Sequence, residues 1–384
     1  MSINSEIQPR VSIVANGFQY DYIINLNAGL SAYCKVDLIG SDQYLKYQFG
    51  DNINFFNLRG NHNEDVAAGT KMLRMLKYYV RLLLYILGTK SKVIHVQWLR
   101  FYITDGVLFP LLARVFGKKA FYTVHDVLPH DKDTKLNRLI FKVIYKSQTK
   151  IIVHTAFIRN RLLNEFNIKE NKIELVKHGV YKVNLSEDIS YSSARKQFDI
   201  GENDFVFLFF GWIAKYKGLD ILLASFNKIK KEHANIKLVI AGRVFPDYTE
   251  DFEKLMNNTE MSSIKTTIRH IENDEVEPLF KMANVTVLPY TEASQSGVLF
   301  MSYAYGVPVI APDLGGFPYD IEQGKTGMLF HADKQDDLYN TLRDAMIKYP
   351  GYNVERVKNI QRYAADNYSW DASCKKLFTL YANK

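Results

Sequence analysis

One stretch of the sequence, Leu288–Gly316, constrains the fold more than any other. It reads LPYTEASQSGVLFMSYAYGVPVIAPDLGG, so a strand (Val285–Leu288) runs into a polar turn, an apolar helix opened by Gly297, and a second strand (Val307–Ala311). Strand, loop, helix and strand form one crossover unit of a parallel α/β sheet. Helix N-termini beyond the carboxyl ends of such strands offer free N–H groups to anions. The Ser294–Gly297 turn is therefore a candidate diphosphate-binding site. The alternative is an ordinary strand-to-helix loop.

The same alternation of strands and helices runs through the whole chain and predicts two doubly wound α/β domains. At 384 residues the chain exceeds what one small core accommodates. We place the first domain at 1–185, the second at 186–353 and a helical tail at 354–384, with the polar segment Tyr181–Tyr191 as the linker. The predicted strands are Val11–Ala15, Val36–Ile39, Ile53–Asn57, Lys92–Val96, Ala120–Val124, Ile151–His154, Ile173–Val176, Phe205–Phe210, Lys237–Ala241, Thr267–Ile271, Val285–Leu288 and Val307–Ala311.

The composition is that of an ordinary globular protein, with 47% hydrophobic and 23% charged residues. The two cysteines, Cys34 and Cys374, lie at opposite ends and form no metal-binding or redox spacing, which favours a reducing compartment. The N-terminus lacks a basic region followed by an apolar core, and no run of about 18 uncharged apolar residues occurs. We therefore expect a cytoplasmic protein with neither a signal peptide nor a transmembrane helix.

The net charge of +8 is unevenly distributed. The segment Val66–Thr104 has no acidic residue, and the helix predicted within it carries its basic residues, from Lys71 to Arg81, on one side and bulky apolar residues on the other. A basic amphipathic helix is typical of membrane surfaces, so Lys71–Arg81 is a candidate contact with an anionic membrane. The alternative is a helix that buries its apolar side in the domain. We expect no nucleic-acid partner, because no recognisable nucleic-acid module accompanies the basic face.

Several segments, in this order, resemble a known family. They are TVHD (Thr123–Asp126), IIVHTAF and VKHGV in the first half, and FFGWIAKYKGLDILLASF, KLVIAGRV, VTVLPYTEASQSGVLFMSYAYGVPVIAPDLGG and GKTGMLF in the second. They resemble the family-4 retaining glycosyltransferases, in which two Rossmann-like domains face each other across a cleft (the GT-B architecture). The resemblance is close over Phe205–Phe330 and fainter in the first domain. It implies an α/β GT-B fold and metal-independent transfer of a sugar from a nucleotide-sugar donor, without a bound cofactor. It also implies that the terminal helical segment, 354–384, crosses back to the first domain.

The resemblance implies a role for each site residue by its position. Lys217 matches the lysine that holds the donor diphosphate, His125 matches the histidine that contacts the sugar, and Glu292 lies one residue from the first glutamate of the family's paired-glutamate motif. These three are the catalytic candidates. The donor-binding candidates are Gly211, Lys215, Arg243, Ser294, Gln295, Ser296, Gly297 and Val298. The candidates for acceptor or cleft contacts are Asp126, His130 and His178.

The chemistry of these residue types agrees with the implied roles. An ammonium group suits a phosphate as a compact positive charge, and hydroxyl and amide side chains hydrogen-bond sugar hydroxyls. For Lys217 the alternative is a lysine that caps a surface turn. For His125 it is a satisfied structural histidine, because a lone histidine is more often structural than functional.

The sequence departs from the family pattern in three places. One is Pro318-Tyr319-Asp320 after the double glycine, where a proline-glutamate pair is usual, so that any carboxylate there is displaced by one residue. Met301 occupies the position of the second glutamate, which holds the nucleotide ribose, and a thioether cannot accept hydroxyl donors in that way. Trp212 and Ala214 occupy the places at which an arginine usually accompanies the lysine, so Lys215 or Arg243 would supply the second positive charge.

We therefore expect a retaining glycosyltransferase of cell-surface polysaccharide or glycolipid biosynthesis. Its partners would be a nucleotide-sugar and a sugar or lipid-linked saccharide acceptor. One alternative is a catalytically inactive GT-B protein with a binding or regulatory role, for which Met301 is the main argument. The other is a different GT-B enzyme, such as a sugar-nucleotide epimerase or a phosphorylase. The sequence lacks the carboxylate-rich hydrolytic site expected of an epimerase. It also lacks the pyridoxal-binding lysine context expected of a phosphorylase.

Overall fold

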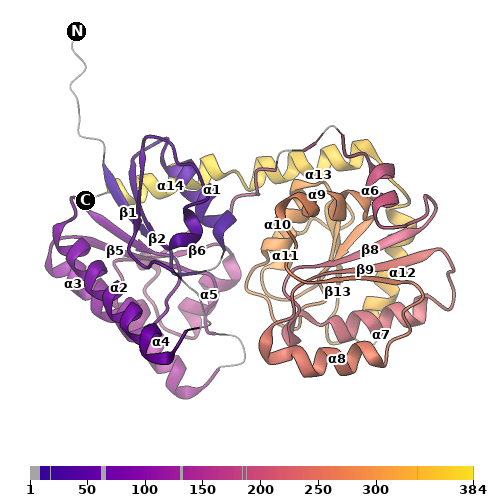
Figure 1. Ribbon diagram of the computed structural model, residues 1–384, viewed down its shortest axis with the longest axis horizontal. Coiled ribbons are helices and arrows are strands. Elements are labelled where there is room, and N and C mark those ends of the chain that lie inside the picture. The colour runs from indigo at the N-terminus through magenta and orange to yellow at the C-terminus, as the bar shows by residue number, and fades with distance from the viewer. Residues whose placement is uncertain are drawn as a thin grey trace, which may run out of the picture. The chain divides into compact units, whose positions relative to one another are not determined.

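The computed structural model describes residues 9–17, 19–61, 66–129, 133–183, 185–186, 188–334 and 336–383. The chain divides into two compact units: unit 1 is Met1–Gly179 with Tyr368–Lys384, and unit 2 is Val180–Asn367. Each unit is a parallel β-sheet with helices on both faces (Figure 1). The prediction of doubly wound α/β architecture is therefore confirmed. No helix in the described ranges is both long enough and apolar enough to cross a membrane.

Unit 1 is built on a seven-stranded sheet in the order β3-β2-β1-β4-β5-β6-β7. Helices α1 and α14 pack on one face, and α2, α3, α4 and α5 pack on the other. The elements in chain order are β1 (Arg10–Val14), α1 (Tyr20–Leu30), β2 (Lys35–Gly40), η1 (Asp42–Tyr44), β3 (Ile53–Asn57), α2 (Ala68–Gly88), β4 (Val93–Val96), the π-helical turn η2 (Thr104–Leu108), α3 (Phe109–Val115), β5 (Lys119–Val124), α4 (Lys135–Ser147), β6 (Lys150–Val153), α5 (Ala156–Asn164), η3 (Glu170–Lys172), β7 (Ile173–Leu175) and α14 (Trp370–Ala382).

Unit 2 is built on a six-stranded sheet in the order β10-β9-β8-β11-β12-β13. Its first strand, β8, lies inside the sheet, as β1 does in unit 1. The elements are α6 (Tyr191–Gln197), β8 (Phe205–Phe210), η4 (Lys215–Lys217), α7 (Leu219–Ile229), β9 (Ile236–Gly242), η5 (Pro246–Tyr248), α8 (Thr249–Asn257), β10 (Ile264–Ile268), α9 (Asn273–Met282), β11 (Val285–Val287), α10 (Gly297–Ala304), β12 (Val309–Pro312), α11 (Phe317–Asp320), β13 (Gly327–Phe330), α12 (Asp337–Lys348) and α13 (Val354–Asn367).

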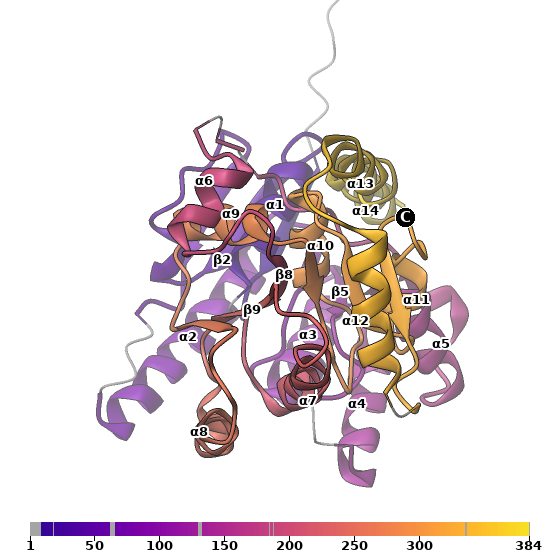
Figure 2. The same ribbon diagram turned by 90° about the vertical axis from the view of Figure 1, so that its right-hand side faces the viewer.

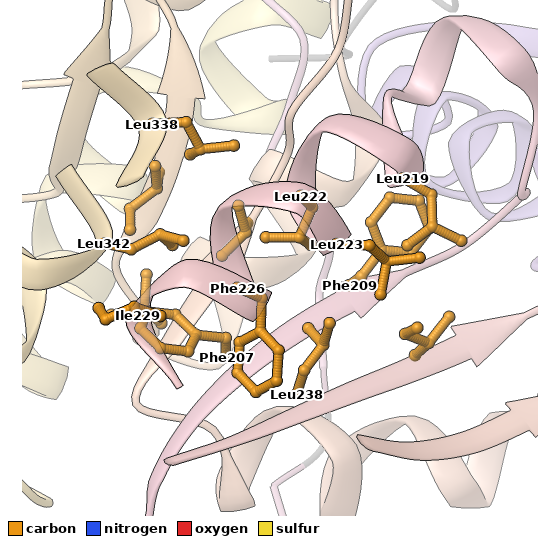
Figure 3. Packing of buried hydrophobic residues seen from close by; sticks show 14 of the residues in the cluster. Phe207, Phe209, Leu219, Leu222, Leu223, Phe226, Ile229, Leu238, Leu338 and Leu342 are labelled. Carbon is orange, nitrogen blue, oxygen red and sulfur yellow. The ribbon is translucent and has the colours of Figure 1, made fainter. Parts of the chain in front are cut away.

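The sequence of β8, FVFLFF, shows why this sheet is buried on both faces. Alternate residues of a strand point to opposite faces. Phe207 and Phe209 pack against α7, where they meet Leu222 and Phe226 (Figure 3). Leu208 belongs to a separate hydrophobic cluster on the other face. A continuous apolar run is what a parallel strand covered by helices on both sides requires.

Two predicted elements differ from the structure. The strand predicted at Thr267–Ile271 lies earlier, at Ile264–Ile268, because only the first residue of this edge strand is buried and the strand has no apolar run. The helical tail is two helices: α13 packs on α10 in unit 2, and α14 packs on α1 in unit 1.

Candidate functional site

In unit 2, the two loops that carry most of the predicted donor-binding residues follow neighbouring strands. Strand β8 pairs with β9 on one side and with β11 on the other, so the winding of the chain reverses between β8 and β11. Ligands of open α/β sheets bind beyond the carboxyl ends of the strands at such a reversal. The loop after β8 carries Gly211, Lys215 and Lys217, and the loop after β11 carries Glu292 and Ser294–Ser296.

Lys217 ends the short helix η4, and its ammonium group lies over two aromatic rings. Its Nζ is 3.9 Å from the centre of the Tyr290 ring and 4.9 Å from that of Tyr216. Tyr290 is buried, and its hydroxyl lies 3.2 Å from Oγ of Ser296. The cation–π contact keeps the ammonium group beside the loop after β11. The structure therefore brings Lys217 and Ser296 together through Tyr290, which the sequence reasoning did not single out.

Two glycines allow the loops of this site to approach one another. Gly218 has φ +65°, and a Cβ atom there would lie 1.9 Å from the carbonyl oxygen of Pro289. Gly315 also has φ +65°, and its Cβ would lie 1.6 Å from the carbonyl oxygen of Ala293. Neither position accepts a side chain without movement of the backbone. The loops after β8 and β12 therefore both pack directly against the loop after β11.

The predicted diphosphate-binding site lies at the start of α10. Ser296 is the residue before the helix, and its side chain makes no capping hydrogen bond. The first N–H groups of a helix have no partner within the helix, so they are suited to an anion. The side-chain oxygen of Gln295 is buried, and no hydrogen-bond donor for it is found among the described residues. Both features favour a ligand with oxygen atoms and hydroxyl groups at this loop.

The predicted donor-site residue Arg243 lies in the loop after β9. The Arg243 guanidinium lies 5.7 Å from the centre of the Trp212 ring, which meets the Phe245 ring edge-on at 5.7 Å. A parallel bridge between Ile213 and Val244 aligns the two loops. Trp212 and Phe245 are about half exposed, at 47% and 45%. The sequence reasoning did not use this aromatic pair, although an aromatic residue directly after a strand and its glycine was a visible signal.

The remaining predicted donor-site residues of unit 2 occupy different environments. Gly211 and Val298 are neighbours, because a Cβ on Gly211 would lie 3.3 Å from Cγ2 of Val298. Lys215 and Glu292 are exposed. Met301 is partly buried and packs against a hydrophobic cluster. The position that holds a ribose-binding carboxylate in the family is thus occupied by a partly buried apolar side chain in this chain.

In unit 1, His125 follows β5 and stacks on Trp98, with ring centres 4.2 Å apart and planes 7° apart. Burial, together with the nearby imidazoles of His154, His178 and His95, holds the pKa of His125 well below its ordinary value. The ring is therefore neutral at neutral pH. Its Nε2 atom has no hydrogen-bond partner among the described residues. A neutral imidazole with one unused nitrogen is suited to a hydroxyl group of a ligand.

The predicted cleft residue His178 belongs to the same cluster of buried rings. Tyr22 lies at its centre, 5.0 to 5.6 Å from the rings of His125, His154 and His178. The hydroxyl of Tyr22 lies 3.1 Å from Nε2 of His154. Nδ1 of His178 lies 2.6 Å from the carbonyl oxygen of Gly179. Burial lowers the pKa of His178 to about 3 and that of His154 to about 4.

The sequence reasoning missed two polar residues of unit 1, Asn16 and Gln97. They follow β1 and β4, the neighbouring strands between which the winding of this sheet reverses. Both amide atoms of Gln97 and Nδ2 of Asn16 are buried, and the described residues provide no hydrogen-bond partner for them. Trp98 covers Gly17, where a Cβ atom would lie 2.4 Å from the indole ring. Polar residues directly after two buried strands were the signal that could have identified them.

The other predicted acceptor or cleft residues of unit 1 are Asp126 and His130. Asp126 is half-buried directly after His125. His130 lies outside the described residues. Within the described ranges, no group of three or more histidine, cysteine, aspartate or glutamate side chains is arranged to hold a metal ion.

Two family models together span most of the chain. The model for Glycosyltransferase Family 4 matches residues 22–181, and the model for Glycosyl transferases group 1 matches residues 191–366. An uncharacterised glycosyltransferase of Methanocaldococcus jannaschii is 24% identical over 258 residues, which cover 65% of this chain and 64% of the relative. A D-inositol 3-phosphate glycosyltransferase of Corynebacterium aurimucosum is 22% identical over 283 residues, which cover 71% and 66%. The chain thus spans just under two thirds of the length of these curated relatives.

Solved structures match almost the whole chain. A sucrose-phosphate synthase from Thermosynechococcus elongatus superposes with a TM-score of 0.76 at 16% identity, covering 97% of this chain and 98% of the other. HepE of Anabaena, solved in complex with UDP and glucose, superposes with a TM-score of 0.74 at 13% identity, covering 97% and 99%. Two Rossmann-like units of this topology define the GT-B class of fold. Within that class, the chain belongs to glycosyltransferase family 4, the group-1 glycosyl transferases.

Proposed function

We propose that this protein transfers a sugar from a nucleotide-sugar donor to an acceptor hydroxyl, with retention of configuration at the anomeric carbon. The observation that carries the proposal is the position of Lys217, held over Tyr290 next to the start of α10. A compact cation and a helix N-terminus on adjacent loops are complementary to a diphosphate. The HepE structures with UDP and with UDP-glucose support a nucleotide-sugar as the donor. Retention follows from the family resemblance.

The proposed reaction breaks the bond between the anomeric carbon and the donor diphosphate. A bond from the acceptor oxygen to the same carbon forms, and the acceptor proton is released. The main catalytic requirement is to stabilise the negative charge on the departing diphosphate. We propose that this stabilisation needs no metal ion. It would come from the side-chain cations Lys217, Arg243 and Lys215 and from the backbone N–H groups at Gly297. Neutral His125 would hydrogen-bond the sugar through Nε2.

We further propose that the acceptor is a sugar or a lipid-linked saccharide, in the synthesis of a cell-surface polysaccharide or glycolipid. Three buried amide atoms, Nδ2 of Asn16 and both amide atoms of Gln97, have no hydrogen-bond partner among the described residues. Together with the face of Trp98 they support a ligand rich in hydroxyl groups in unit 1. The basic segment Lys71–Arg81 supports a cytoplasmic protein that associates with an anionic membrane.

A second candidate function is a non-catalytic GT-B protein that binds a partner or senses a ligand. The packing of Met301 against the hydrophobic cluster favours it, because this position then offers no carboxylate to a nucleotide ribose. The intact arrangement of Lys217, Tyr290 and Ser296 favours the enzyme.

The test is a thermal-shift panel with the diphosphates of uridine, guanosine, adenosine, cytidine and thymidine, each with and without its sugar. A ligand that binds only the folded state raises the melting temperature. We expect one nucleotide to do so, and Lys217→Ala to weaken its binding about 10- to 100-fold by loss of a charge-assisted contact. Lys254→Ala, at an exposed lysine of α8, is the matched control and should bind as the wild type does.

The same panel can reject the proposal. If no nucleotide stabilises the wild type, the non-catalytic candidate takes its place. If a nucleotide stabilises the wild type and Lys217→Ala equally, the donor site lies elsewhere. Turnover at saturating donor then tests catalysis, and normal turnover in Lys217→Ala would contradict the assignment of this residue.

A further inference from the structure

Helix α2 carries two apolar stripes, and only one of them packs against the domain. Tyr78, Leu82 and Ile86, spaced four residues apart, are buried on the sheet of unit 1. The opposite side of the helix is also apolar. Its residues follow helical spacing and are 41% to 63% exposed: Leu73, Leu76, Val80, Leu84 and Leu87. An ordinary surface helix is polar on that side. The alternative that α2 merely buries its apolar side therefore accounts for half of its apolar residues.

The two neighbouring helices repeat this arrangement. Figure 1 and Figure 2 show α2, α3 and α4 on the same side of unit 1, and all three contribute to one hydrophobic cluster on that face of the sheet. Tyr79 of α2 stacks on Phe109 of α3, and Tyr102 meets Phe141 of α4. Each of α3 and α4 has a buried stripe and, opposite to it, an exposed apolar stripe. The exposed stripes consist of Leu108, Leu111 and Val115 on one side of α3 and Leu136, Leu139 and Val143 on α4.

We call these eleven exposed residues of α2, of Leu108–Val115 and of α4 the α2–α4 face. Single exposed apolar side chains are normal, but a contiguous set marks an interaction surface. In unit 2, Trp212 and Phe245 form an exposed pair, whereas Ile221, Ile347 and Tyr319 lie on three different helices, α7, α12 and α11.

The charge on the helices of the α2–α4 face is mostly positive. Helices α2, α3 and α4 with the turn η2 contain nine lysines and arginines and one acidic residue, Asp105. Asp105 is 1% exposed, and its carboxylate accepts hydrogen bonds from the backbone N–H groups of Arg100 and Phe101. On α4, Arg138 is paired with Asp133 and Glu165, whereas on α2 the exposed apolar side chains lie beside the cations Lys77 and Arg81.

We propose that the α2–α4 face docks on an anionic lipid bilayer, with its leucine and valine side chains inserted at the boundary between headgroups and acyl chains. Apolar residues flanked by lysine and arginine are the combination that interfacial helices use. Each lysine or arginine near an anionic surface adds to the electrostatic attraction. A second copy of this chain fits less well, because a two-fold interface would place the same cations against each other.

This surface deepens the membrane contact proposed above for Lys71–Arg81, and it rests on that part of the proposed function alone. The membrane contact then involves three helices instead of one. The exposed apolar side chains insert into the bilayer, in addition to the electrostatic attraction of the lysines and arginines. Because lipid binding requires no sugar donor, its failure is distinguishable from failure of the glycosyltransferase proposal.

The first test measures flotation of the full chain with vesicles of phosphatidylglycerol and phosphatidylcholine. We expect the wild type to bind these vesicles and to bind pure phosphatidylcholine at least about tenfold more weakly. Leu76→Glu combined with Leu84→Glu should reduce binding at least tenfold, by placing carboxylates on the inserted stripe. Ile347→Glu is the matched control, because Ile347 is 76% exposed on α12 of unit 2 and lies outside the α2–α4 face. This control should bind like the wild type.

The second test separates insertion from adsorption. Both native cysteines are buried, so a cysteine introduced by Leu84→Cys can be labelled selectively with a polarity-sensitive fluorophore. We expect its emission to shift to the blue on anionic vesicles, and the label at Ile347→Cys to stay unchanged. Lys77→Gln with Arg81→Gln should weaken binding, whereas Lys254→Gln with Lys358→Gln, two exposed lysines of unit 2, should not.

Three results would overturn the proposal. The first is a wild type that does not bind anionic vesicles at low salt. The second is equal binding by the wild type and the double glutamate variant. The third is a wild-type dimer in light scattering that Leu84→Glu converts to a monomer without any binding to lipid, since the α2–α4 face would then be a contact between two copies of the chain.

Discussion

At the scale of single residues, the site of unit 2 depends on a position that has no side chain. Gly218 separates Lys217 from the helix α7, and its left-handed backbone passes directly beneath the carbonyl oxygen of Pro289. This approach places the Lys217 ammonium over Tyr290. A larger residue at 218 would displace the lysine as well as the loop.

We therefore predict that Gly218→Ala destabilises the protein and abolishes the nucleotide-induced thermal shift. Gly351→Ala is the control, since Gly351 has a similar φ of +61° and open space around its Cβ position. Left-handed strain costs each variant about 1–2 kcal/mol, so the additional loss in Gly218→Ala measures the clash with Pro289. Equal melting temperatures and equal nucleotide binding in the two variants would show that the close approach has no role.

The sequence could predict Lys217 and Gly218 because they lie together in one short motif. It could not predict Tyr290 as the partner of Lys217, because the two are 73 positions apart and meet only through the packing of two loops. Asn16 and Gln97 were missed for the same reason. Each is an ordinary polar residue after a strand, and the strand order of the sheet reveals their proximity to the reversal point.

At the scale of elements, the buried strands were predictable, and the edges and the tail were less so. A strand such as β8 is a continuous apolar run, which the sequence displays directly. The edge strand β10 has a single buried residue, Ile264, and was placed three residues too late. The tail was predicted as one segment crossing between domains. In the structure, α14 belongs to unit 1, where its inner side is buried against α1.

We predict that α14 is an integral part of the unit 1 core. Leu377, on its inner side, is 3% exposed, so Leu377→Ala should lower the free energy of unfolding by about 2–5 kcal/mol. Ile347→Ala removes a side chain of similar size from an exposed position of α12 and should change the free energy of unfolding by less than about 0.5 kcal/mol. Urea denaturation measures both. A Leu377→Ala variant as stable as the Ile347→Ala control would mean that α14 is peripheral to unit 1.

At the scale of the whole molecule, the two units have separate hydrophobic cores, so a single two-state unfolding transition is not expected. The units also differ in their buried ionisable groups. Among the described residues of unit 1, four histidines are buried: His95, His125, His154 and His178. Burial lowers the pKa of His95 to about 3, and its ring lies 2.6 Å from the Tyr381 hydroxyl of α14. These residues couple the stability of unit 1 to pH.

The last prediction follows from this coupling. An unfolded histidine takes up a proton near pH 6.5, whereas the buried neutral rings of the folded unit take one up only near pH 3–4. Between these values the unfolded state binds more protons, so the stability of unit 1 is complete above about pH 6.5 and falls as the pH decreases toward 4. Each such histidine contributes a loss of about 1.4 kcal/mol per pH unit within this window.

The measurement isolates unit 1 by its fluorescence. The chain has three tryptophans, and Trp212→Phe leaves only Trp98 and Trp370, both in unit 1. In this background, urea midpoints between pH 7 and pH 4.5 should fall steeply, and His95→Gln should make the decline shallower. His270→Gln, at an exposed histidine of unit 2, should leave it unchanged. A His95→Gln variant with the same pH dependence as its parent would mean that His95 takes up its proton equally in both states, and the burial of this ring would not explain the acid sensitivity of unit 1.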